Sequence, residues 1–151
     1  MKNLNQFLFF AIGAAILSGC GGSSSSGTAN NYSGIYNGTS TITLRGLGTT
    51  YTESLPLRIV VGVEGRVDVS TPGSTGATCS GPQVPMVLVG NKASGTATNV
   101  SCTSQDLRCT VSGTISYTFA SDSASQTGTA VMNCNVGQVD VTYSGFVRKT
   151  G

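Results

Sequence analysis

The sequence predicts an all-β domain, an antiparallel meander of about eight strands that follows an N-terminal signal segment and a tether. Three observations predict it. Beyond residue 31 the chain is rich in Thr, Val, Ser, Gly and Tyr, and no segment repeats its apolar residues at the helical period. Apolar and polar residues alternate over short segments. Turn-forming pairs such as Gly90-Asn91 separate these segments, so the strands follow one another as hairpins.

The clearest strand runs from Cys109 to Phe119, where Val111, Ile115 and Tyr117 share one face and serines and threonines occupy the other. This alternation is typical of an antiparallel strand with one buried face. Other segments show the same pattern less completely. We expect strands near residues 32–44, 51–63, 66–71, 84–89, 92–102, 108–119, 126–135 and 137–148.

Sequential hairpins of this kind can close into a small barrel, which removes the exposed edges of an open sheet. A small closed barrel is therefore the preferred architecture. A two-sheet β-sandwich stays the alternative, because the stretch from Pro72 to Pro85 could carry the chain between two sheets. Glycines inside the strands, such as Gly113 and Gly128, are interpreted as bends that relieve crowding in a narrow barrel.

Four cysteines lie in this domain: Cys79, Cys102, Cys109 and Cys134. An even number suits two disulfides in an exported protein. A hairpin centred on Gly90-Asn91 sets the first two opposite each other, and a turn near Asp122 does the same for the last two. We therefore prefer Cys79 with Cys102 and Cys109 with Cys134. Pairing Cys102 with Cys109 ranks second, because Cys79 would then have to reach Cys134 from a non-neighbouring strand.

The first residues predict a targeting segment. Lys2 supplies a positive charge, Phe7 to Leu17 are almost all apolar, and the apolar run is too short to span a bilayer. The run ends at Leu17-Ser18-Gly19-Cys20, which resembles the lipobox of bacterial lipoproteins. The alternative is an ordinary secretory signal with a chance cysteine at its end.

The lipobox resemblance implies cleavage before Cys20, acylation of that cysteine and anchoring in a bilayer of the cell envelope. Several acyl chains on one residue would make the anchor stable. In the lipoprotein family an Asp after the cysteine retains the protein at the inner membrane, so Gly21 favours the outer membrane. The expected division is a signal peptide at 1–19, a lipidated Cys20 with a Gly/Ser-rich tether at 20–31, and one all-β domain at 32–151.

Charge and composition exclude several classes of function. The chain has eight Lys and Arg against six acids, and removal of residues 1–19 takes away only Lys2. A nearly neutral domain without a basic run argues against a nucleic-acid partner. The chain has no histidine, which removes the usual general base and the commonest metal ligand. The acids are isolated and are expected at turns or on the polar side of strands. We expect no catalytic residue, no metal, no cofactor and no enzymatic activity.

Aromatic side chains remain as candidates for binding. Tyr117, Phe119 and Tyr143 share the apolar phase of their strands, so they are expected in the core. Phe146 instead shares its phase with polar residues of the last strand, and Ile35 does so in the first. If the barrel closes first strand to last, Ile35 and Phe146 could form a small outer patch for a partner.

These observations predict a non-enzymatic module that is held at a membrane by acylated Cys20 and binds an envelope protein or polymer, which the sequence does not identify. A small-ligand carrier with a hollow barrel is the alternative. In size, export, disulfides and strand content the domain also looks like the small β-barrel lipoproteins of the lysozyme-inhibitor type. That resemblance adds inhibition of a lysozyme-like enzyme as a further alternative, without any inhibitory residue.

Overall fold

The computed structural model describes residues 31–72, 78–80, 86–104 and 106–151. The predicted signal peptide, Cys20 and the tether up to residue 30 lie outside these residues. The described residues form nine strands: β1 (Gly34–Gly46), β2 (Thr49–Val61), β3 (Arg66–Ser70), β4 (Thr78–Ser80), β5 (Met86–Val89), β6 (Lys92–Ser104), β7 (Leu107–Phe119), β8 (Ser123–Cys134) and β9 (Gly137–Lys149).

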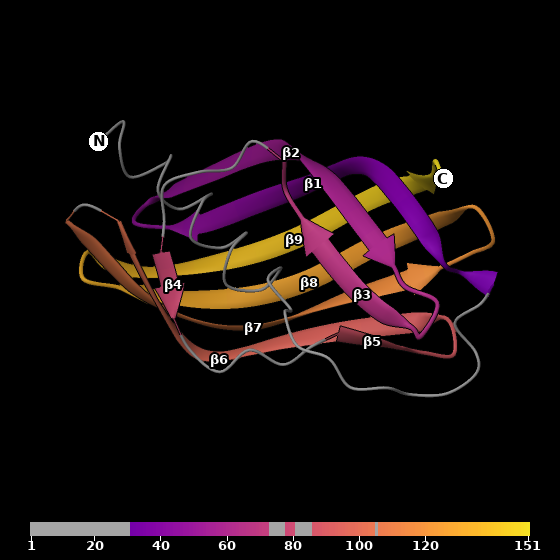
Figure 1. Cartoon of the computed structure of the whole chain (residues 1–151). Helices are drawn as coiled ribbons and strands as arrows, with labels where there is room; N and C mark the ends of the chain where they lie inside the picture. The colour runs from indigo at the N-terminus through magenta and orange to yellow at the C-terminus, as the bar shows by residue number, and fades with distance from the viewer. Residues whose placement is uncertain (1–30, 73–77, 81–85, 105) are drawn as a thin grey trace.

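The strands form a closed barrel (Figure 1). Neighbouring strands follow the order β4-β6-β5-β3-β2-β1-β9-β8-β7, and a further pairing of β6 with β7 closes the circle. All these pairings are antiparallel. The prediction of an eight-stranded closed meander is confirmed. The β-sandwich alternative is wrong, because β3 and β5 join β2 to β6 in one continuous sheet.

One strand was not predicted. β4 is three residues long and pairs with the far part of β6, on the same edge as β5, within the stretch that we interpreted as a link. A segment so short carries almost no alternation, so its pairing depends on contacts distant in sequence. The eight predicted ranges correspond to the other strands, with ends that differ by a few residues.

The inward face of the barrel is apolar, as the alternation predicted. Tyr117, Phe119 and Tyr143 are all buried, so their assignment to the core is confirmed. Tyr36 joins them, and its ring meets that of Phe119 edge to face at 5.4 Å between centroids. These side chains belong to one cluster of buried residues that runs through the barrel.

Glycines occupy the inward positions where neighbouring strands lie close. A Cβ atom on Gly113 would lie 2.4 Å from the carbonyl oxygen of Thr129 and 2.5 Å from Cα of Ala130. A Cβ on Gly128 would lie 2.7 Å from the carbonyl oxygen of Thr114. Larger residues would push these strands apart, so both glycines keep the barrel narrow.

The two ends of the barrel differ. At the end where the described chain begins, Tyr32 packs against Phe119 with ring centroids 6.1 Å apart, and the amide of Ile35 donates to the carbonyl of Gly151. We call this the Tyr32 end. The opposite end carries the turns after β1, β6 and β8 and the four cysteines, and we call it the disulfide end (Figure 1).

Candidate binding face

A polar bridge crosses the interior of the barrel. Ser40 on β1 donates a hydrogen bond to the side-chain oxygen of Gln126 on β8, although β9 lies between these strands. The intervening residue in register is Gly145, which has no side chain to block the path. The amide nitrogen of Gln126 in turn donates to the hydroxyl of Tyr117 at 3.0 Å. Ser40 and Gln126 are both buried, so the bridge satisfies polar groups that water cannot reach.

The interior tyrosines are held in their neutral form. Desolvation by burial raises the pKa of the Tyr117 hydroxyl, an effect that the hydrogen bond from Gln126 partly offsets. Burial also raises the pKa of Tyr143 well above its usual value, and the nearby Tyr117 adds to the shift. Within the described residues, the Tyr143 hydroxyl has no hydrogen-bond partner. Neither tyrosine is poised to act as a base near neutral pH.

The acidic residues do not converge. Asp68 pairs with Arg66 at 3.0 Å, while Glu64, Asp106, Asp122 and Asp140 are exposed. The expectation for Glu53 is wrong: this residue lies in the inward phase of β2, opposite Ile42, and is half-buried. β3 pairs only with residues 58–61 of β2, so Glu53 lies on the part of β2 beyond that pairing. Among the described residues no three metal-ligating side chains gather.

The outer face carries two rows of hydroxyl groups that cross six adjacent strands from β6 to β2. The register aligns one residue of each strand in each row. The first, the threonine row, consists of Thr96, Thr114, Thr129, Thr142, Thr43 and Thr52. The second, the mixed row, consists of Ser94, Ser116, Thr127, Ser144, Thr41 and Ser54. Neither row contains a charged residue.

Hydroxyls at the two sides of this face bond to each other. The side chains of Thr43 and Thr52 lie 3.1 Å apart, and those of Ser94 and Ser116 lie 3.0 Å apart. In the middle, Thr114, Thr129 and Thr142 are exposed, and their hydroxyls have no protein partner in the part of the chain that the structure describes. The middle of the face is therefore available for hydrogen bonds to a ligand.

A groove of about 360 Å³ lies at this place on β7, β8 and β9. Four of its nine lining residues carry hydroxyl groups, four are apolar, and one, Asp140, is charged. The lining consists of Ser112, Gly113, Thr114, Thr129, Ala130, Val131, Asp140, Val141 and Thr142. Gly113 and Ala130 face each other in register, so the groove overlies the closely packed pair described above.

Four successive outward-facing residues of β9 are Asp140, Thr142, Ser144 and Phe146, and we call them the outer line of β9. Phe146 is 51% exposed, and the guanidinium of Arg148 lies 6.0 Å from its ring centroid. The predicted patch of Ile35 and Phe146 is not formed by direct contact. Phe146 faces Thr39, and Ile35 lies four residues further along β1, about 13 Å away.

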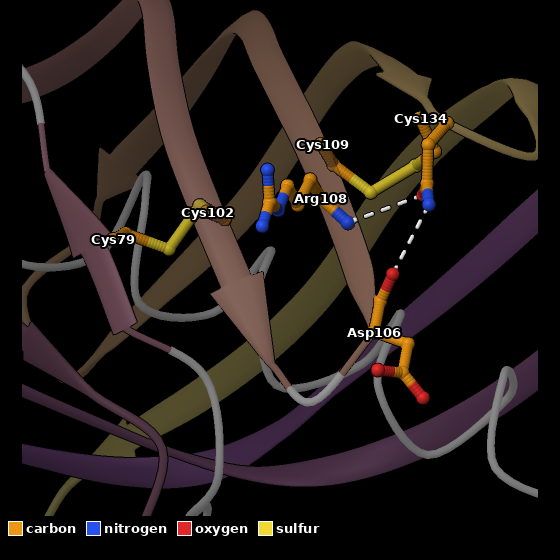
Figure 2. The surroundings of a disulfide bond; sticks show 7 residues. Cys79, Cys102, Asp106, Arg108, Cys109 and Cys134 are labelled. Carbon is orange, nitrogen blue, oxygen red and sulfur yellow. Dashed lines mark hydrogen bonds between the residues drawn. A yellow bond between two sulfur atoms is a disulfide. The ribbon is translucent and has the colours of Figure 1, made fainter.

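The disulfides have the preferred pairing. Sγ atoms of Cys79 and Cys102 are 2.09 Å apart, and those of Cys109 and Cys134 are 2.10 Å apart (Figure 2). Cys102 and Cys109 also face each other in the register of β6 and β7. All four cysteines therefore form one row across four neighbouring strands, which explains why the second-ranked pairing was a close competitor.

Comparison with protein-family models, curated proteins and solved structures finds no match to this chain. Among the residues that the structure describes, no helix is both long and apolar enough to cross a membrane. The hydroxyl rows and the groove were missed at the level of sequence. Their signal was present as serines and threonines on the polar phase of each strand, but only the register shows that they align.

Proposed function

We propose that this protein is a lipid-anchored module of the bacterial cell envelope that binds a partner through the outer face of its barrel and catalyses no reaction. One observation carries this proposal: the groove lies on the outside of the barrel, beside the threonine row, which supplies Thr114, Thr129 and Thr142 to its lining. The lipobox-like Leu17-Ser18-Gly19-Cys20 supports the lipid anchor, and Gly21, which follows it, supports a location at the outer membrane.

The packing of the interior favours surface binding over a carrier role. A carrier needs a cavity that encloses most of its ligand. Here Tyr36, Tyr117, Phe119 and Tyr143 are all buried among the inward-facing residues. A ligand of any size inside the barrel would have to displace these rings and the Gln126 bridge.

The position of the groove suits an anchored protein. The described chain begins at the Tyr32 end, where β9 ends as well (Figure 1). Asp140 lies in the groove, and Lys149 ends β9 at the Tyr32 end. The two lie nine residues apart along the strand, which corresponds to about 30 Å. A domain tethered through residues 20–31 would therefore hold the groove away from the point of attachment.

A membrane fractionation tests the anchor. We expect the full-length protein in the membrane pellet, released by detergent and not by high salt, because acyl chains bind by burial of apolar surface. The Cys20→Ser variant should move to the soluble envelope fraction. A wild-type protein that salt releases, or a variant that stays in the membrane, would contradict the anchor.

A photo-crosslinking experiment in intact cells tests the binding face. p-Benzoylphenylalanine at position 129, inside the groove, should form an adduct with the bound partner upon irradiation. The same probe at Ser70, an exposed position on β3 that lies outside the groove and outside both hydroxyl rows, is the control. Equal adducts at both positions, or none at position 129, would contradict binding through this face.

A further inference from the structure

We infer that the groove and the outer line of β9 bind a strand of neutral polysaccharide. This inference rests on the proposed function, since it names the partner of the same face. The polymer lies along β9 from Asp140, over Thr142 and Ser144, to Phe146.

The chemistry of the rows selects an uncharged ligand. Hydroxyl groups both donate and accept hydrogen bonds, so the threonine and mixed rows match a polymer whose surface is also made of hydroxyl groups. The groove lining holds no cation, and its one charged residue is Asp140. Asp140 faces Arg45 on β1 in register, so the two charges offset each other and the groove has no net positive charge that would select a polyanion.

A protein partner fits the groove less well. The cores of protein interfaces are apolar and rich in aromatic residues. In the groove, Val131 is the only exposed large apolar side chain among the lining residues, and it is 37% exposed. Thr114, Thr129 and Thr142 of the threonine row line one side of the groove, and Ser112, Val131 and Asp140 line the other.

The line along β9 offers three kinds of contact in sequence. Alternate residues of a strand lie about 7 Å apart, so Asp140 and Phe146 are separated by about 20 Å. The Asp140 carboxylate can accept hydrogen bonds from adjacent sugar hydroxyls. Thr142 and Ser144 add exposed hydroxyls, and the exposed ring of Phe146 can pack against the C–H face of a sugar ring.

Co-sedimentation of the detergent-solubilised full-length protein tests this inference. The probes are suspended cellulose, curdlan and chitin as neutral polymers, with immobilised alginate as a polyanion. We expect binding to at least one neutral polymer and none to alginate. Binding to alginate alone, or to none of the four, would overturn the inference.

Three variants locate the bound polymer. Phe146→Ala should weaken binding about three- to tenfold by loss of the ring contact. Thr129→Val with Thr142→Val should weaken it about tenfold or more, because valine keeps the shape of threonine and removes the hydroxyl. The control is Thr118→Val on β7, which is exposed and lies outside the groove. Equal binding by all variants would also overturn the inference.

The crosslinking experiment separates the two levels of the proposal. An adduct at position 129 in cells, combined with no binding to neutral polymers, would retain the binding face and reject the polysaccharide. A protein adduct at that position would identify the competing class of partner. Absence of any adduct would instead reject the proposed function. Each variant is compared with the wild type by circular dichroism, so that a loss of binding is assigned to a folded protein.

Discussion

Replacement of Gly145 by alanine is expected to destabilise the barrel by about 2 to 4 kcal/mol. The new Cβ would lie 2.7 Å from the side-chain oxygen of Gln126 and 2.8 Å from the carbonyl oxygen of Thr39. Relief of this overlap costs about 1–3 kcal/mol. Loss of the buried bond between Gln126 and Ser40 costs a further 1–3 kcal/mol, roughly. The reduced freedom of the unfolded chain returns about 0.4–1 kcal/mol.

Urea unfolding followed by circular dichroism measures this change. With a slope of about 2 kcal/mol per molar urea, the midpoint should fall by about 1 to 2 M. Gly62→Ala is the matched control, because its Cβ would meet only the flexible carboxylate of Glu64 at 3.0 Å or more. If the urea midpoint of Gly145→Ala equals that of the wild type within error, the absence of a side chain at position 145 is not required for the Gln126 side chain to reach Ser40 across β9.

Two further predictions follow from the interior. In the double variant Cys79→Ala with Cys134→Ala, the two remaining cysteines face each other, so peptide mapping after oxidation should find them joined; two free thiols would contradict the register. Burial raises the pKa of Tyr117 and Tyr143 in the folded state. The contribution of these two tyrosines to stability is fully present below about pH 10, the pKa of tyrosine in the unfolded chain. Above that pH the free energy of unfolding falls by up to about 1.4 kcal/mol per pH unit for each tyrosine. Tyrosinate absorbance should therefore show that both ionise only on unfolding, and their ionisation in the folded protein would contradict their burial.

The sequence predicted what depends on local pattern. The alternation from Cys109 to Phe119 identified β7 and its buried face, and the turn at Gly90-Asn91 brought Cys79 opposite Cys102. Each of these inferences uses the pattern within one strand or the register that continues from a recognisable turn: Leu88 faces Ala93 beside Gly90-Asn91, and β4 keeps the same register against β6. For the same reason Tyr143 could be placed in the core before its neighbours were known.

What the sequence could not predict depends on register across many strands. The distance between Ile35 and Phe146 follows from the offset between β1 and β9, which are distant in sequence. The threonine row requires all six strands to be aligned, and a shift of one residue would turn its members inward. The inward phase of Glu53 was missed because a charged residue is normally assigned to the solvent face.

Intact-mass measurement of the membrane-extracted protein, with and without reduction, tests the central claim most directly. We expect the mass of residues 20–151 with added acyl chains, and an increase by four protons on reduction of the two disulfides. A mass that corresponds to the unprocessed chain, or to a processed chain without lipid, would contradict the proposal of a membrane-anchored binding module.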